Sequence, residues 1–333
     1  MTLIALPSTS ARLTGLDALR GVAALAVVLM HTHALFPSFP DYAPKAYLAV
    51  DFFFVLSGFV MARTYEHRLA KGYGAGRFFA ARYHRLWPTM LLGALLFLPF
   101  LNEATHDPDW HWQSQVLPNL LLLPSLSSDN LFPLNVPAWS IFFELVANLI
   151  HGLVLWRLRL RWIAAIALLS LIGIVQAAMT LGNFDIGSAH GQLLAGLFRV
   201  GVTYCMGIAL WRVWGERRLH GYIGLLALLA LPLAFTVSDN ALHGWIYDLG
   251  FVLLACPLLM LGALAISRGT GLAKISGDLS FPLYAVHYPI LYWCRSYELG
   301  PWESVLVCAL IAALVAGVQN GWQITSRNRS STI

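Results

Sequence analysis

Charged residues are scarce in this chain: Asp, Glu, Lys and Arg form only 11% of its 333 residues, whereas about 25% is usual in a soluble domain. Cysteine is scarce as well. The four cysteines lie in or beside apolar stretches and form no CxxC pair, so we expect neither a disulfide framework nor a metal site. No glycine-rich phosphate loop is present, which excludes the common soluble nucleotide-binding classes.

Hydrophobic residues, by contrast, form 58% of the chain and gather in long runs. Ten of these runs approach or reach the length of about 20 residues that spans a bilayer: 19–36, 47–64, 86–101, 138–156, 162–181, 193–211, 219–237, 246–266, 275–294 and 304–322. No small-residue cleavage site follows the first run, so we expect a retained helix rather than a signal peptide. The sequence therefore predicts an all-α polytopic membrane protein with about ten transmembrane helices.

The distribution of basic residues predicts the orientation of these helices, because Lys and Arg accumulate in cytoplasmic loops. With the N-terminus inside, all but three of the 21 Lys and Arg residues fall in inner loops; the exceptions are Lys45, Arg199 and Arg295. Residues 1–15 and 324–333 are thus predicted to be cytoplasmic tails of a single transmembrane domain, 1–333, with no fused soluble domain. The net charge of +5 reflects this orientation, so membrane lipids rather than a nucleic acid are the expected partners.

The longest predicted outer loop, 102–137, contains an apolar segment at 116–126 that is too short to cross a bilayer. We expect this segment to lie at the outer interface or to re-enter the membrane. Trp110, Trp112 and Trp139 flank it. Indole rings at this level usually anchor a protein to the membrane, but one of them, Trp139 above all, is also suited to stack on a sugar.

Arg20 and His31 lie eleven residues apart in the first apolar run. Eleven residues make about three helical turns, so both side chains are predicted to share one face, roughly 16 Å apart along the axis. Ionisable residues within a span are costly and usually face a bundle interior where they carry out a function.

Other buried polar residues are predicted to form two groups at different depths. The outer-half group comes from five separate runs and comprises His31, Asp51, Glu144, Asn148, Arg199 and His287. The inner group is basic and comprises Arg63, Arg77, Arg82 and Arg85, with Arg20 between the two groups.

Simpler explanations exist for most of these residues. Arg82 and Arg85 fit the usual excess of positive charge on the inner side, and Asp51 fits a cap at a helix N-terminus. Glu144 and Arg199 are also suited to neutralise each other within the bundle. A satisfied core histidine is a weaker explanation for His31, because it shares a spanning face with Arg20.

Six segments carry a family resemblance when taken in order. They are LDALRG at 16–21 followed by His31, VDFFFVLSGF at 50–59, RFFAARYHRLWP at 77–88, AWSIFFE at 138–144, Arg199 before Gly207, and PLYAVHYP at 282–289. The ordered set resembles the acyltransferase-3 family of membrane O-acyltransferases, which modify extracytoplasmic carbohydrates. The usual ten-helix core of that family agrees with the segmentation above.

The resemblance implies transfer of an acyl group, acetyl by default, from acyl-CoA to a hydroxyl of a carbohydrate or glycolipid at a bacterial inner membrane. No tightly bound cofactor is expected. Acyl-CoA is a cytoplasmic polyanion, so Arg82 and Arg85, assisted by Arg77 or Arg63, are predicted to bind its phosphates. The pantetheine arm would then follow the polar face upward from Arg20.

His31 is the predicted general base, because the pKa of a free imidazole is near neutral. Glu144 is a candidate to orient that ring and Arg199 a candidate to stabilise the oxyanion, with Asp51 completing the catalytic set. Trp139, Asn148 and His287 are the predicted acceptor-binding residues.

Three alternatives stay open. An acyl-enzyme route would use His31 or Ser57 as the acyl carrier. A different class of protein, a transporter or exporter of a small anion or glycolipid, would use the same buried charges as a substrate pathway. A sensory or scaffolding role is a third, weaker interpretation.

Overall fold

The computed structural model describes residues 12–101, 112–215, 217, 219–238, 244–266 and 271–330, with the side chains of 112, 113 and 322–330 left aside. Its helices are α1 (Thr14–Leu35), α2 (Ala49–Ala70), α3 (Ala75–Phe97), α5 (Leu117–Leu120), α6 (Ala138–Leu153), α7 (Leu160–Leu181), α8 (Leu193–Trp214), α9 (Gly221–Phe235), α10 (Gly244–Gly250), α11 (Cys256–Leu264), α12 (Gly271–Ser296) and α13 (Pro301–Ser330). No strand occurs in these ranges beyond one isolated bridge between Asn130 and Ala189. The predicted all-α class is confirmed.

Each of the ten predicted runs coincides with a helix, although the run 246–266 is divided into α10, a π-helical turn (Phe251–Ala255) and α11. Six helical segments are long and apolar enough to span a membrane by themselves: Thr14–Leu35, Ala46–Ala70, Leu160–Leu181, His190–Trp214, Gly244–Leu264 and Pro301–Gly321. α6 and α9 are apolar but shorter. The chain is a polytopic α-helical membrane protein.

α3 begins at Ala75, eleven residues before the predicted start of its apolar run. The helix therefore includes Arg77, Arg82 and Arg85, which had been expected in a loop. Arg and Ala are good helix formers, so the charged segment continues the helix instead of interrupting it. This extension carries the predicted donor-binding arginines into the bundle.

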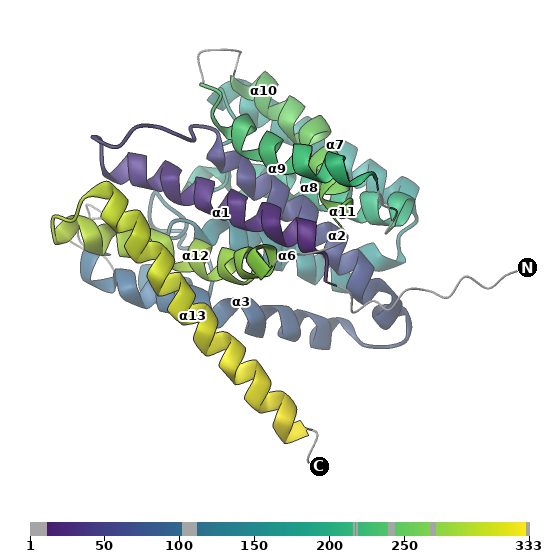
Figure 1. Ribbon diagram of the computed structural model, residues 1–333. Coiled ribbons are helices and arrows are strands. Elements are labelled where there is room, and N and C mark those ends of the chain that lie inside the picture. The colour runs from purple at the N-terminus through teal and green to yellow at the C-terminus, as the bar shows by residue number, and fades with distance from the viewer. Residues whose placement is uncertain are drawn as a thin grey trace, which may run out of the picture.

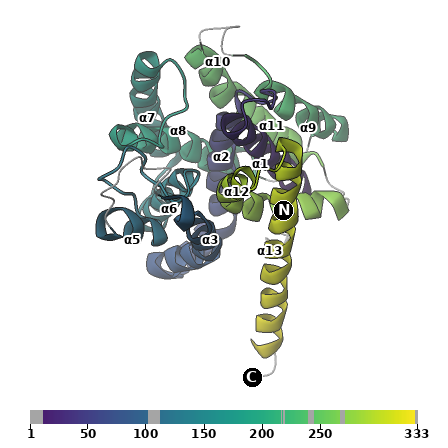
Figure 2. The same cartoon turned by 90° about the vertical axis from the view of Figure 1, so that its left-hand side faces the viewer.

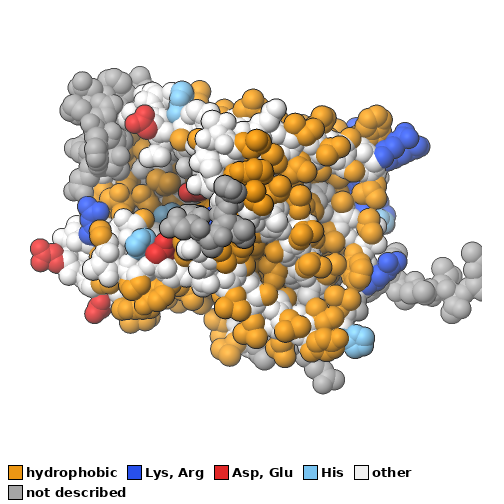
Figure 3. Space-filling model, turned by 90° about the horizontal axis from the view of Figure 1, so that it is seen from above, with side chains coloured by type: hydrophobic (Ala, Val, Ile, Leu, Met, Phe, Trp, Pro, Cys, Tyr) orange, Lys and Arg blue, Asp and Glu red, His pale blue; other side chains and the backbone are white. Residues whose placement is uncertain are grey.

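The surface in Figure 3 has a wide hydrophobic band between two charged ends. Lys and Arg gather at the end where α1 begins, called the basic end here, and Asp and Glu at the end where α1 finishes, called the acidic end (Figures 1 and 3). On α13, Leu306, Leu310, Leu314 and Val318 repeat every fourth residue and are 58–70% exposed, as expected for a helix that faces lipid. That the basic end faces the cytoplasm stays a prediction.

α1, α2 and α12 form the centre of the bundle (Figure 2). The span that contains α2 is the most enclosed of the six: 89% of its most apolar stretch is buried, against 17% for α7. α8 packs on α2, and α7 packs on α8. α3 and α6 close the other side, so the polar residues of α2, α3 and α6 face one another.

The close approach of α1 and α12 depends on two glycines. A Cβ atom on Gly21 would collide with Ser276, and one on Gly277 would collide with Asp17. Small residues at such positions let two spans pack backbone to backbone. This contact fixes the residues one to three turns further along, including His31, against α12.

The apolar segment of the 102–137 loop re-enters the bundle. The Trp87 indole donates to the carbonyl oxygen of Leu120 at 2.8 Å, and the Tyr83 hydroxyl donates to that of Leu121 at 3.2 Å. Tyr83 lies fourteen residues, about 21 Å, from the acidic end of α3 at Phe97. The segment therefore extends well below the acidic end, and interfacial placement alone does not describe it. Residues 102–111, including Trp110, lie outside the described ranges.

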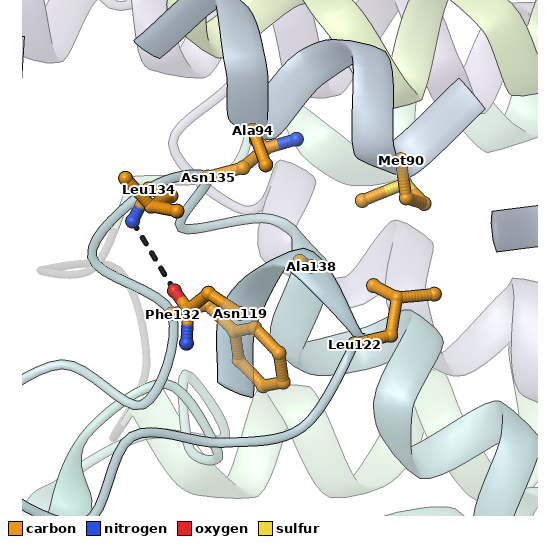
Figure 4. A pocket seen from close by; sticks show the side chains of 8 residues that line it. All are labelled: Met90, Ala94, Asn119, Leu122, Phe132, Leu134, Asn135 and Ala138. Atoms are coloured by element: carbon orange, nitrogen blue, oxygen red, sulfur yellow. Dashed lines mark hydrogen bonds between the residues drawn. The ribbon is translucent and has the colours of Figure 1, made fainter. Parts of the chain in front are cut away.

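The Asn119 side chain holds this segment in its folded shape. Its amide oxygen accepts from the Leu134 backbone at 3.3 Å, and its amide nitrogen donates to the Leu131 carbonyl at 3.1 Å. Figure 4 shows a small pocket between α3 and the segment, bordered by Met90 and Leu122.

Candidate functional site

Two imidazole rings meet where α1 and α12 pass each other. Nδ1 of His31 lies 3.2 Å from Nε2 of His287, and the ring centroids are 5.0 Å apart. Tyr288 packs edge-on against the His31 ring at 5.3 Å. His287 is fully buried and His31 is partly exposed. His31 thus faces the bundle interior and keeps some accessible surface.

Side chains of the α6 region hold α12 at this level. Pro289 has no N–H, so the Ala285 carbonyl loses its usual helical donor. The Asn135 amide donates to that carbonyl at 2.8 Å. The Tyr284 hydroxyl, one turn before His287, is 2.7 Å from Ser140 Oγ and 3.2 Å from the Pro137 carbonyl. The proline that weakens the helix is therefore compensated, and His287 is held in place.

A second polar cluster lies deeper, toward the basic end. Oε1 of Glu144 accepts from Ser57 Oγ at 2.8 Å and from Arg82 Nη2 at 3.1 Å. The charges of Arg20 and Arg82 also act on Arg85, as does that of Glu144. We call Arg20, Arg82, Arg85, Glu144 and Ser57 the arginine cluster. It combines three positive charges with one negative charge, and at its edge Arg20 also pairs with Asp17 at 3.4 Å.

Arg85, Arg20 and Glu144 of the arginine cluster keep accessible surface although they lie well inside their helices. Arg85 is exposed, and the side chains of Arg20 and Glu144 are 24% and 14% accessible. Arg85 lies within electrostatic range of Arg20 on α1, Tyr65 on α2 and Glu144 on α6. Nε of Arg82 is buried without a hydrogen-bond partner, so one donor of this guanidinium is unsatisfied. The cluster is suited to bind an anion.

Arg20 and His31 lie on α1 eleven residues apart, as the sequence predicts. α1 therefore joins the arginine cluster to the histidine pair across about 16 Å.

A third polar network is buried and has its charges paired within the protein. Nη2 of Arg199 is 2.7 Å from Asp51 Oδ2, and the same guanidinium donates to the backbone carbonyls of Tyr47 and Ile186 at 2.8 and 2.9 Å. The two charged side chains are 1% and 0% exposed. The N–H donors of Arg199 are largely used in these contacts, so few remain to stabilise an oxyanion.

The closed network continues through a second ion pair. Lys45 Nζ is 3.2 Å from Asp248 Oδ1, and the Tyr47 hydroxyl donates to Asp248 Oδ2 at 2.8 Å. Lys45 and Asp248 are again 1% and 0% exposed. We call Lys45, Asp51, Arg199 and Asp248 the closed charge network; its formal charges cancel.

The remaining predicted site residues are distributed around these networks. Trp139 is buried, with Arg199 over its ring at 5.3 Å, and so has no face free for a sugar. Asn148 is buried and accepts from the Tyr204 hydroxyl at 3.0 Å. Arg63 is buried in α2, whereas Arg77 is exposed in the first turn of α3.

The predicted outer-half group is therefore not one site. His31 meets His287, Asp51 meets Arg199, and Glu144 meets Arg82 of the inner group. Glu144 lies six residues, about 9 Å, below the start of α6, which brings it to the level of Arg82 instead of His31. The expected orientation of the His31 ring by Glu144 is not observed.

Sequence reasoning missed the contribution of Lys45 and Asp248. Lys45 had been taken as an outer-loop residue, and Asp248 was not singled out. A signal was present, because Asp248 is an acid at the start of the apolar run 246–266. Among the described residues, no group of three or more His, Cys, Asp and Glu side chains is placed to hold a metal ion.

Comparison with known proteins gives a family-level match. Residues 13–318 match a family model described as an acyltransferase domain. "Protein 2 in picA locus" of Rhizobium radiobacter is 36% identical over 154 residues, which cover 41% of this chain and 79% of that protein. "O-acetyltransferase OatA" of Staphylococcus aureus is 24% identical over 92% of this chain, which spans 55% of OatA. No solved structure gives a significant match.

Proposed function

The chain belongs to the acyltransferase-3 family of membrane O-acyltransferases, and from this premise we propose that it transfers an acyl group from cytoplasmic acyl-CoA to a hydroxyl of an extracytoplasmic carbohydrate or glycolipid. Acetyl is the proposed acyl group, in keeping with the name of the relative OatA. The proposed location is a bacterial inner membrane, with the basic end toward the cytoplasm. The observation that carries the proposal is the accessible, positively charged arginine cluster joined by one helix to His31.

The donor enters from the basic end in this proposal. Its phosphates pair with Arg85 and with the free Nε–H of Arg82, while Glu144 and Ser57 hold Arg82 in position. Such charge-assisted hydrogen bonds are about twice as strong as neutral ones. The flexible pantetheine arm then passes Arg20 and follows α1 toward His31. Arg63 and Arg77 are assigned supporting roles at the entrance.

His31 performs the chemistry. Its Nε2 removes the proton of the acceptor hydroxyl while that oxygen attacks the thioester carbonyl carbon. The new C–O bond forms and the C–S bond breaks, and the CoA thiolate then takes the proton back from His31. The products are the ester and free CoA thiol, so no acyl-enzyme is needed.

The closed charge network has a structural role in this proposal. Arg199 and Asp51 neutralise each other and tie α8 to α2. Neither has an accessible polar atom to offer a substrate, which argues against the catalytic roles predicted for them.

Mass spectrometry of envelope glycans tests the proposal. Glycans from cells with and without this protein are compared, and an alkali-labile gain of an acetyl mass is expected only with the protein. A parallel assay supplies radiolabelled acetyl-CoA to inside-out membrane vesicles that contain the protein and a native envelope extract. Release of CoA thiol together with labelled glycan supports transfer, whereas solute movement without thioester consumption would identify a transporter.

A further inference from the structure

The positions of three backbone oxygens assign the protons of the histidine pair. Nδ1 of His287 lies 2.9 Å from the Tyr284 carbonyl oxygen and 3.2 Å from that of Leu283. A carbonyl oxygen only accepts hydrogen bonds. His287 Nδ1 must therefore carry a hydrogen, so the Nε2 atom of neutral His287 holds a lone pair.

The same reasoning applies to His31. Its Nδ1 lies 3.0 Å from the Val27 carbonyl oxygen and 3.2 Å from His287 Nε2, the atom that holds the lone pair. Both neighbours are acceptors, so His31 Nδ1 carries the hydrogen. In the opposite tautomers, the Nδ1 lone pair of each ring would face a backbone carbonyl oxygen, which is repulsive. In neutral His31 the basic lone pair is therefore on Nε2.

We propose that His287 is a positioning residue that holds His31 in the tautomer and ring orientation whose Nε2 receives the acceptor proton. This inference deepens the proposed function and rests on it. It replaces the acceptor-binding role predicted for His287. In many hydrolases a carboxylate orients the catalytic imidazole, but among the described residues neither ring is within ion-pair distance of a carboxylate. A neutral imidazole and a backbone carbonyl perform that task here.

His31 takes up the hydroxyl proton without passing a proton on to His287. When His31 Nε2 takes the hydroxyl proton, His31 becomes an imidazolium, and its Nδ1–H bond to His287 becomes charge-assisted and stronger. The Nδ1–H of His287 stays hydrogen-bonded to the Tyr284 carbonyl oxygen throughout. The proton on His31 Nε2 then passes to the CoA thiolate.

The other groups packed around the pair are two tyrosines, a cysteine and a phenylalanine. Tyr284 and Tyr288 of α12 contact the rings, and Cys308 Sγ of α13 lies 3.7 Å from the His287 carbonyl oxygen. Phe97 of α3 stacks on Tyr288. No described side chain carrying a charge contacts either ring. A shift in the acid limb of the pH profile therefore reports on the two histidines.

A matched pair of variants tests the role of His287. In His287→Asn the amide replaces Nδ1–H but leaves no acceptor at the position of Nε2. In His287→Gln the amide oxygen reaches about that position and restores the acceptor. With radiolabelled acetyl-CoA and the envelope extract, we expect His287→Asn to lower kcat about 10- to 100-fold, the effect of losing one hydrogen bond to a charged group. The KM for acetyl-CoA should stay within about twofold, because the arginine cluster is unchanged.

The pH profile separates positioning from a purely structural role. In His287→Asn the imidazolium of His31 loses an acceptor, so the acid limb of kcat should move to lower pH by about half a unit to one unit. His287→Gln should recover most of kcat and the original profile. His33→Asn, in the last turn of α1, is the control and should behave as wild type.

Unaltered kcat and pH profile in His287→Asn would overturn the inference, as would equal loss in the Asn and Gln variants with an unshifted profile. A readout that needs no turnover is the ¹⁵N-histidine NMR difference between wild type and His31→Gln. We expect protonated Nδ1 and unprotonated Nε2 for neutral His31, and the reverse assignment contradicts the inference. Wild-type protein that transfers no acyl group would refute the proposed function and leave this tautomer test standing.

Discussion

The arginine cluster and the closed charge network are both buried charge assemblies, yet they differ in balance and access. The closed network pairs two cations with two carboxylates whose side chains are 0–1% exposed. The arginine cluster sets three guanidinium groups against Glu144 and the neighbouring Asp17, and keeps accessible surface on Arg85 and Arg20. Charges that neutralise each other away from solvent stabilise the bundle, whereas unbalanced and accessible charges await a ligand of opposite sign.

The largest effect is expected from breaking the closed network. Arg199→Met leaves Asp51 as an unpaired buried charge and should lower the free energy of unfolding by about 3–5 kcal/mol. Thermal unfolding in detergent measures this loss. The double variant Asp51→Leu/Arg199→Met removes both charges and should recover most of the stability.

The kcat of the same double variant tests whether the closed charge network takes part in catalysis. The Arg199 and Asp51 double variant should keep near-wild-type kcat, because neither side chain contacts substrate in this account. A stable double variant with no transfer activity would instead return Arg199 and Asp51 to the catalytic role predicted from the sequence.

A smaller and different effect is expected from the open cluster. Arg85→Gln should raise the KM for acetyl-CoA about 10-fold, since one charge-assisted contact to phosphate is lost. Its thermal stability should be unchanged, because Arg85 is exposed. Arg161→Gln, an exposed arginine at the basic end of α7, is the control. Equal effects of the two substitutions on KM would mean that general positive charge at this end, and not the cluster, attracts the donor.

The smallest effect is expected from salt. Raising the ionic strength from about 0.05 to 0.5 M shortens the screening length to a few ångströms and should raise the KM for acetyl-CoA several-fold through the accessible cluster. The closed network is shielded from solvent, so the unfolding temperature should change little over the same range. A KM that does not respond to salt would argue against phosphate recognition by the arginine cluster.

Much of the fold was predictable from the sequence, because apolar runs of spanning length report directly on helices in a membrane. The shared face of Arg20 and His31 was also predictable, since helical periodicity determines it. Which residues on different helices contact one another was not predictable. The depth of Glu144 depends on where α6 begins relative to α3, and this follows from the re-entrant segment that connects them.

For a similar reason, the sequence does not distinguish the arginine cluster from the closed charge network. Arg199 and Arg82 are both arginines in or beside apolar runs, and only packing reveals that the first meets Asp51 and two carbonyls while the second keeps a free donor. The contact of His31 with His287 likewise depends on the glycine-mediated approach of α1 and α12.

The most direct test of the account is the kcat of His31→Gln in inside-out vesicles supplied with radiolabelled acetyl-CoA and native envelope extract. Removal of the general base should lower kcat about 10²- to 10⁴-fold and leave acetyl-CoA binding to the arginine cluster intact. A His31→Gln protein that transfers acetyl at the wild-type rate would contradict the central claim.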